Sequence, residues 1–585
     1  MTPTLPQDAK DTEARRKALE VARDRYRYSY TYPPEVAWAD EVPKGEGYTI
    51  PYLADYVMVE ATLKANHVAA DLEGLEEFSP ADHERDTAHL RPEHLRERLF
   101  SVGASIAAKM KRTRFESVEE FERFFGIIER PAMLGLFTGS QSEQDRVFAW
   151  QRVAGANPMV MRGVDALPDK LPVTEAHFLA AMGEGDSLAA ALAEGRAFVA
   201  DYAHLDGLPA GENGDTPKFV FAPIALFVRP KTGRDALCPV AIQCGQRPGD
   251  EFPVFTPADG VRWRMARTLV QMADGNDHET VQHLGRTHCV MEAVVLAFYR
   301  NVPPQHPLHV LMTPHFEYTL ALNDSAKHSL IAPGGGVDHV LAMTLEASVE
   351  LTGKALTEFR LDEASPDQEL AARGVADTEG LPSYPYRDDG LAVWGAITKY
   401  VTEYLALYYP DEASVAGDVE MQAFFRELGA RDGGRLGGVP DAIETRAQLG
   451  ELLSTIVWIA SAQHSALNYA QFPFMGMIPN LPGAAYAAAP TASTPDEEAS
   501  LVALLPPVDV ATEHFTLAYQ LSSFRRNYLG EYPLLHFKHR AAKKVADAFK
   551  RHLEDVELLV GTRDGARLVT YPFMKPSMIA ASIHI

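Results

Sequence analysis

The chain has 585 residues, of which 46% are hydrophobic and 23% charged, a composition typical of a globular protein with a large buried core. Its 55 basic and 80 acidic residues give a formal net charge of −25, which argues against nucleic-acid binding and against general attraction to anionic lipid. A negatively charged ligand would therefore have to enter at a local basic patch or through an apolar opening.

The compartment is indicated by the cysteines and the N-terminus. Cys238, Cys244 and Cys289 form neither a disulfide framework nor a CxxC motif, which is typical of a reducing compartment. The N-terminal residues are polar and charged and contain no apolar run of a signal peptide. No window approaches 18 consecutive apolar residues. We expect a soluble, cytoplasmic protein that spans no membrane and makes at most transient contact with a lipid surface.

The predicted elements, in chain order, are mainly helices. Residues 1–45 are expected to form a peripheral arm, with a charged helix over 11–26 followed by a linker rich in proline and tyrosine. Between 219 and 245, two β-rich runs flank the turn-like KTGRDA, which predicts a hairpin. Residues 484–495 are rich in alanine, proline and threonine, which predicts an exposed loop. Apolar periodicity predicts helices over 52–66, 94–112, 117–129, 262–301, 391–409, 448–472, 510–523 and 538–558. The class is therefore mainly α, with a small β subregion and a single large domain over 46–585.

Three histidines recur at intervals of five inside a predicted helix: His278, His283 and His288. Five residues of an ideal α-helix turn through about 500°, which leaves side chains five apart pointing roughly 140° away from each other. His283 and His288 can face one ion only if a π-type insertion adds residues to the turn, and such insertions often occur at functional sites. The spacing therefore predicts either a π-bulge or no shared site. A zinc-protease HExxH motif is excluded, because Gln282 stands where its second histidine would be.

A second pair lies far downstream, where His464 and Asn468 are four residues apart. Such residues lie about 40° apart on one helix face. On its own the pair is equally well explained as buried polar groups in the core. Buried polar groups need partners, however, and a metal ion is one such partner.

Taken together, these segments resemble the lipoxygenase family. The resemblance is clearest over 283–331, which starts with HLGRTHCVMEAVV, and over 460–482, ASAQHSALNYAQFPFMGMIPNLP. Further similar segments follow the family's order: GANPMVMR (155–162), PVAIQC (239–244), YRDDGLAVWGAITKYV (386–401) and YPFMKPSMIAASIHI (571–585). Roughly residues 145–585 are covered. The chain is too short for the lipid-binding PLAT or C2-like β-barrel of animal and plant members, so it resembles the bacterial, single-domain type, with a large helical catalytic domain.

The resemblance implies one non-haem iron per chain, with manganese as an alternative that the ligand types do not exclude. The implied ligands are His283, His288, His464, Asn468 and the terminal carboxylate of Ile585. No catalytic side chain is implied beyond the metal-bound hydroxide. Glu279 and Gln471 match outer positions near the substrate channel, and His278 matches a histidine beside the metal that is not a ligand. The positions that match substrate and stereochemical control are Ala326, Leu284, Gly275, Val340 and Leu341.

The implied reaction inserts O₂ into polyunsaturated fatty acids such as arachidonate and linoleate. A ferric hydroxide removes a hydrogen atom from a bis-allylic CH₂, O₂ adds on the opposite face, and the peroxyl radical reoxidises the iron. Ala326 matches the position where the family carries alanine for S products and glycine for R products, so S-hydroperoxides are expected. Gly275 implies a deep pocket floor, which favours carbon 12 of arachidonate, with 15S or 13S oxygenation as the alternative; a mere helix start explains this glycine equally well.

Two other functions remain open at this point. A lipoxygenase-like hydroperoxide isomerase would keep the fold but rearrange peroxides without O₂. A catalytically silent lipid-binding protein would carry a vestigial site, which the five intact ligand positions argue against. We expect a monomer whose partners are the fatty acid and O₂, with no nucleic acid.

Overall fold

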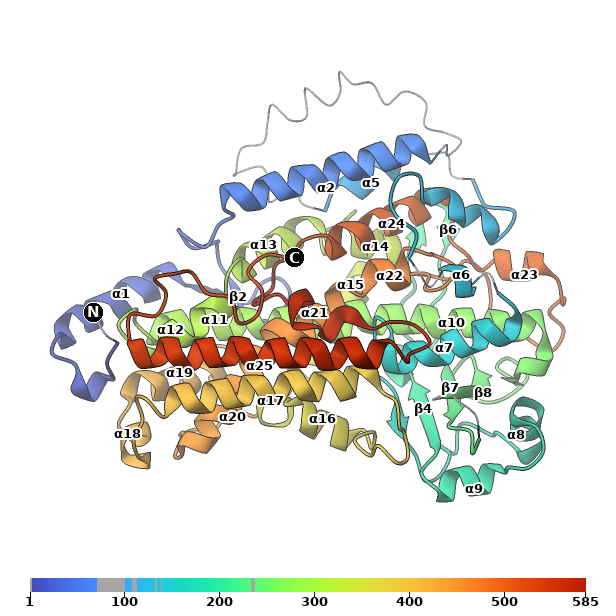
Figure 1. The fold of residues 1–585 in the computed structure, drawn as a ribbon. Coiled ribbons are helices and arrows are strands. Elements are labelled where there is room, and N and C mark those ends of the chain that lie inside the picture. The colour runs from blue at the N-terminus through green and yellow to red at the C-terminus, as the bar shows by residue number, and fades with distance from the viewer. Residues whose placement is uncertain (1–2, 71–99, 108–112, 132–133, 138, 233–236) are drawn as a thin grey trace.

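The computed structural model describes residues 3–70, 100–107, 113–131, 134–137, 139–232 and 237–585 (Figure 1). The prediction of a mainly α protein with a small β subregion is confirmed. The described α-helices longer than ten residues are α1 (Thr12–Arg25), α2 (Ile50–Ala69), α7 (Gln141–Ala154), α10 (Val261–Asp277), α11 (Val290–Asn301), α13 (Thr319–Ser329), α15 (Leu345–Glu358), α17 (Pro385–Leu405), α19 (Val419–Gly429), α20 (Arg446–Trp458), α24 (Val508–Ser522) and α25 (Arg540–Asp564). Among the described residues, no helix combines the length and apolar composition needed to cross a membrane.

The centre of the molecule is one long helical run over residues 261–301. It consists of α10, a π-helix from His278 to Cys289, and α11, joined end to end (Figure 1). Almost every side chain from Trp263 to Phe298 is buried. The π-helix packs against α15 and against the short helix α21 (His464–Asn468). A polar group on this run must therefore find its partner inside the protein.

The β subregion is a five-stranded antiparallel sheet in the order β3–β4–β7–β8–β9. Its strands are β3 (Arg162–Gly163), β4 (Ala197–Asp201), β7 (Ile224–Val228), β8 (Cys238–Gln243) and β9 (Val254–Phe255). The predicted hairpin is confirmed, since β7 pairs with β8 from Ile224–Gln243 to Val228–Cys238; part of its turn lies outside the described residues. Every residue of β7 is fully buried because alternate side chains enter the main core and a smaller core on the other face.

Residues 117–129 do not form the predicted α-helix. The described structure has a short 3-10 helix, Glu119–Phe124, after which the chain turns. Oδ1 of the buried Asn66 accepts hydrogen bonds from the backbone N–H groups of Gly126, Ile127 and Ile128, at 3.0, 2.9 and 2.9 Å. These groups point at one side chain and are therefore not available for a helical ladder. Of the predicted helix over 94–112, the described part contains α5 (Val102–Ala107).

The loop predicted over 484–495 is irregular, but its first three residues are not exposed. Ala484, Ala485 and Tyr486 are buried. The carbonyl of Ala485 accepts from Phe219 N at 2.9 Å, and Tyr486 N donates to Leu504 O at 3.0 Å. Small residues here allow close backbone pairing, so composition alone predicted the exposure of these three residues wrongly.

The described residues of the N-terminal arm, 3–45, are packed onto the helical body. Helix α1 lies against α11, and its Arg15 is buried in an ion pair with Glu420 on α19. Farther along, Ala39 N donates to Oε1 of Glu292 on α11 at 2.8 Å. Buried contacts therefore cross residue 45, and the domain boundary there stays a prediction.

Candidate metal centre

The π-helix brings two histidines that are five residues apart to the same side of the helix. Within it His283 and His288 face each other, with their Nε2 atoms 3.2 Å apart. Of the two outcomes that the spacing predicted, the π insertion is the one the structure contains.

Hydroxyl groups satisfy backbone carbonyls around the insertion. Thr287 Oγ1 donates to Gln282 O, five residues earlier, at 2.8 Å. Thr352 Oγ1, on α15, donates to Thr280 O at 3.0 Å. Gly285 permits this close packing, because a Cβ there would lie 3.1 Å from Ala355 Cβ and 3.3 Å from Thr352 O. The unusual turn is therefore supported from the neighbouring helix.

His464 reaches the same point from a different segment. It begins α21, directly after a second π-helix, Ile459–Gln463, which the sequence did not predict. The ring centroid of His464 lies 5.5 Å from that of His283 and 5.2 Å from that of His288. Each of the three rings offers one nitrogen, and these nitrogens lie within 4.8 Å of one another.

Hydrogen bonds on the outer nitrogens orient two of the rings. Nδ1 of His288 lies 2.7 Å from Oδ1 of Asn323, and Nδ1 of His283 lies 3.4 Å from Oε2 of Glu279. When Nδ1 donates, the lone pair is on Nε2, which is the atom that faces the cluster. Burial lowers the pKa of His288 to about 3 and also lowers the pKa values of His283 and His464. These shifts favour the neutral imidazole, the form that binds a metal.

The chain's last residue lies at the cluster. The carbonyl-type oxygen of Ile585 is 3.0 Å from Nε2 of His464, and the residue is buried. The preceding residues are held in the core: Ala580 N donates to Ser465 Oγ at 3.0 Å, and Ala581 O lies 2.7 Å from Nδ1 of His315. His315 thus holds the C-terminal segment in place.

Asn468 lies one helical turn after His464 and is fully buried. Its Nδ2 donates to Leu521 O at 2.7 Å, and its Oδ1 accepts from Nε2 of Gln471 at 3.0 Å. These bonds fix the orientation of the amide, and its oxygen keeps a second lone pair for another partner. Gln471, predicted as an outer residue, therefore contacts Asn468 directly.

Glu279 and His278 form a polar group beside the cluster. Oε1 of Glu279 lies 3.1 Å from Nδ1 of His278, whose Nε2 lies 3.1 Å from Leu467 O. Burial opposes ionisation of Glu279, but attraction to His278 and hydrogen bonds from His278 and His283 hold the pKa of its carboxyl well below the usual range. Both ring nitrogens of His278 have partners within the protein.

Two residues of this network were missed in the sequence. Asn323 on α13 bonds His288, and its Nδ2 donates to Oε2 of Glu292 on α11 at 2.8 Å. Glu292 in turn accepts from Ala39 N. A buried chain of hydrogen bonds thus runs from the N-terminal arm to the histidine cluster. Glu292 lies four residues after His288, inside a predicted apolar helix. An acidic residue at such a position is the one sequence signal that could have indicated its role.

A largely apolar pocket with about 510 Å³ of empty space adjoins the polar group. Three predicted pocket residues line it, namely Gly275, Val340 and Leu341, and so do Glu279 and Gln471. Its other walls are Leu330, Gly336, Val337, Met475, Leu481, Gly483, His514, Leu517, Ala518 and Leu521. Helix α14 (Gly336–Val340) and α24 thus face the metal-site helices across this space.

The space above Gly275 is occupied by another side chain. A Cβ at this position would lie 2.5 Å from Cδ2 of Leu481. The depth of the pocket is therefore set by Gly275 and Leu481 together, and Leu481 was not predicted. Ala326 on α13 is buried and Leu284 on the π-helix is partly buried, but neither lines this pocket.

A second group of possible ligand residues has a structural explanation. His306 lies close to Asp418 and Glu420. Its Nε2 is 2.9 Å from Oδ2 of Asp418, its Nδ1 accepts from Leu308 N at 3.0 Å, and Glu420 is paired with Arg15. Because these groups already have partners, this cluster fits a buried structural network.

Comparison with known proteins adds to this geometry. The family model described as Lipoxygenase matches residues 110–567. A linoleate 9/13-lipoxygenase of Pseudomonas aeruginosa is 36% identical over 490 residues, which cover 80% of this chain and 70% of that protein. The human hydroperoxide isomerase ALOXE3 is 32% identical over 447 residues, which cover 76% of this chain and 62% of that protein.

The fold agrees with these sequence matches. The anaerobic crystal structure of a LOX variant in complex with arachidonate matches with a TM-score of 0.86 at 26% identity, over 100% of this chain and 84% of that chain. The family match extends over most of the chain and contains all three histidines of the cluster. The protein therefore belongs to the lipoxygenase family, whose members normally bind a non-haem iron.

Proposed function

We propose that this enzyme binds one iron and inserts O₂ into polyunsaturated fatty acids to give S-hydroperoxides. The observation that carries the proposal is the convergence of three imidazoles, from two π-interrupted helices, on one buried point beside Ile585. Histidine nitrogens and a carboxylate are a donor set suited to iron, and manganese is a second candidate for the same donors.

His283, His288 and His464 would hold the metal through Nε2, with the terminal carboxylate of Ile585 and Oδ1 of Asn468 completing the set. The bound iron supplies the one-electron chemistry that removal of a bis-allylic hydrogen atom requires. Glu279 and Asn323 keep the rings of His283 and His288 in the binding orientation. These contacts prepare the site before the metal arrives.

The apolar pocket would take the carbon chain of the substrate and exclude water from its radical. Its walls are mostly leucine, valine, methionine and glycine, and two of its polar residues, Glu279 and Gln471, lie at the side of the metal centre. A chain confined there presents one CH₂ to the metal centre at a time. For the depth set by Gly275 and Leu481 we favour carbon 12 of arachidonate, with carbon 15 of arachidonate or carbon 13 of linoleate as the alternative.

The hydroperoxide isomerase activity is the second candidate, since one relative carries that name. Oxygen uptake by the purified protein with free arachidonate or linoleate, measured together with its metal content, separates the candidates. Uptake with rising conjugated-diene absorbance supports the dioxygenase. Bound iron with no uptake, but with consumption of an added hydroperoxide, supports the isomerase. Absence of bound metal after reconstitution with iron or manganese would leave a lipid-binding protein and overturn the ligand assignment.

A further inference from the structure

Two leucines occupy the apex of a surface turn just before α25. His536 N donates to Pro533 O at 2.9 Å and closes the turn, so Leu534 and Leu535 are its two central residues. They are 88% and 81% exposed, which places both among the most exposed large hydrophobic residues of the described surface. Turn centres usually carry glycine, asparagine, aspartate or serine, so two adjacent leucines here are not required by the backbone. We call these two residues the leucine tip.

The turn is held rigidly from beneath. The ring of Tyr532 stacks on that of His536 with centroids 5.4 Å apart, and Phe537 packs edge-on against Tyr532 at 4.9 Å. Nε2 of His536 lies 2.8 Å from Val310 O on the adjacent α12 (Pro307–Met312). The aromatic residues of this segment therefore face the protein while its leucines face solvent. Stable exposure of adjacent apolar side chains is typical of an interaction surface.

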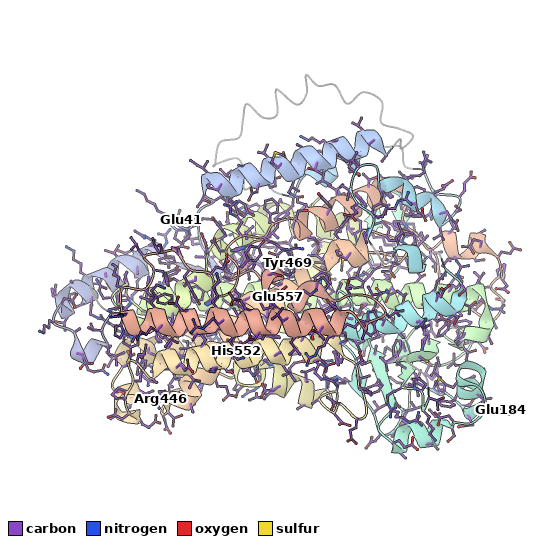
Figure 2. All side chains as sticks on the ribbon, viewed as in Figure 1. Glu41, Glu184, Arg446, Tyr469, His552 and Glu557 are labelled. Atoms are coloured by element: carbon purple, nitrogen blue, oxygen red, sulfur yellow. The ribbon has the colours of Figure 1, made fainter. Side chains whose placement is uncertain are left out.

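The charge around the leucine tip is opposite to that of the molecule. Residues 531–551 contain two acidic residues, Glu531 and Asp547, and six basic ones, all exposed: Lys538, Arg540, Lys543, Lys544, Lys550 and Arg551. The segment thus has a formal excess of four positive charges in a chain of net charge −25. The excess ends abruptly along α25, since His552 is followed by Glu554, Asp555 and Glu557; Figure 2 labels His552 and Glu557 on this helix.

A hollow lies between the turn and the first turns of α25. Leu534 and Phe537 line it together with Lys543 and Lys550, around about 790 Å³ of space. Lys543 pairs with Asp547 at 2.8 Å and Lys550 lies 3.9 Å from Glu531, and the side chains of both lysines are about half exposed, at 52% and 55%. Apolar and cationic groups therefore meet at one place.

We propose that residues 531–551 dock this enzyme on anionic phospholipid membranes, with the leucine tip inserted among the acyl chains. Apolar side chains that enter the headgroup region and basic residues that approach anionic headgroups are the two interactions by which proteins bind the surface of a bilayer. A nucleic acid would use the basic residues but leave the leucines without a role. The inference deepens the proposed function, because a fatty-acid substrate partitions into such a surface, but membrane binding needs no turnover and can be tested separately.

The test is sedimentation of the full-length protein with phosphatidylcholine vesicles that contain or lack phosphatidylglycerol. The expected affinity is at least about tenfold higher with phosphatidylglycerol, and the difference should vanish at high salt because exposed charges are then screened. L534S/L535S should weaken binding to the anionic vesicles at least about tenfold, and K543E/K544E should remove the preference for them.

The matched control is a second exposed leucine pair, which lies on α25. Leu558 and Leu559 are 72% and 42% exposed, but they lie beside Glu554, Asp555 and Glu557. L558S/L559S should leave vesicle binding unchanged. Circular dichroism and iron content establish that each variant is folded. The proposal is overturned by equal binding to both kinds of vesicle, by an equal loss in L558S/L559S, or by salt-sensitive binding to an RNA oligonucleotide without binding to vesicles.

Discussion

Nδ1 of His288 lies 2.7 Å from Oδ1 of Asn323, so an amide on α13 orients a histidine of the π-helix 35 residues earlier in the chain. Asn323 is itself fixed by Glu292, which accepts from its Nδ2 at 2.8 Å. The pair thus connects the metal centre to the buried carboxylate of α11. The contribution of this hydrogen bond can be measured as a change in iron affinity.

Replacement of Asn323 by Leu should weaken iron binding about tenfold to hundredfold, since a histidine that loses its outer hydrogen bond loses its fixed orientation. Iron content after dialysis against a chelator measures this effect. Asn301→Leu is the control, because Asn301 is also buried and bonded but contacts Glu427 and Ala297 rather than the cluster. If both variants retain iron equally, Asn323 has no role at the centre.

The support of the π-helix from α15 can be tested by stability. Thr352→Val removes the hydroxyl that bonds Thr280 O and leaves a buried carbonyl without that donor. We expect a loss of about 1–3 kcal/mol in the free energy of unfolding. Thr357→Val, on the exposed side of the same helix, should change it little. Urea denaturation measures both, and a similar effect of the two substitutions would contradict the assignment.

The floor of the pocket should control the position of oxygenation. Gly275→Phe is expected to shift the product of arachidonate toward the methyl end, because the new ring displaces Leu481 and shortens the pocket. Leu481→Ala should shift it the opposite way. Chromatography of the reduced products gives the ratio of positions. An unchanged ratio in both variants would show that this pocket does not hold the methyl end.

Stereochemistry gives an independent prediction at Ala326. The wild-type protein should form mainly the S-hydroperoxide, and Ala326→Gly should increase the share of R product. Leu330 lines the pocket and lies one helical turn after Ala326, whose carbonyl accepts from Leu330 N. A substitution at 326 is therefore close enough to affect the pocket. Chiral chromatography decides the matter, and a mainly R product from the wild type would refute it.

The contact between α14 and α24 should depend on pH. Nδ1 of His339 lies 3.1 Å from Oε2 of Glu513, and this hydrogen bond, opposed by partial burial, raises the pKa of His339. Asp338 raises this pKa further and Lys218 lowers it. Because the folded pKa lies above the ordinary value of 6.5, the stabilisation is complete below pH 6.5 and is lost as pH rises through the raised pKa.

The size of this effect is limited, because the side chain of His339 is 43% exposed. We expect at most about 1 kcal/mol. Thermal melts of the wild type and of His339→Gln over this pH range should converge as the pH rises. Parallel curves at every pH would exclude His339 as the titrating group.

The sequence predicted the longest helices and the shared site because both leave local patterns, but it did not predict α7 (Gln141–Ala154) or α15 (Leu345–Glu358). The i,i+5 histidines required a π insertion at 278–289, and the structure contains it. The second π-helix, Ile459–Gln463, carries no such pair and gave no signal. Asn323 and Leu481 act on His288 and Gly275 across long stretches of chain, so no spacing rule could indicate them. The helix over 117–129 was wrongly predicted for the same reason, because the distant Asn66 accepts hydrogen bonds from backbone N–H groups of this segment.

The metal content of the purified protein tests the central claim most directly. The account predicts about one iron per chain in the wild type, and loss of that iron in His288→Ala when the variant is still folded by circular dichroism. Thr357→Val should keep the full amount. Full iron content in His288→Ala, or none in the wild type after reconstitution, would contradict the proposed centre.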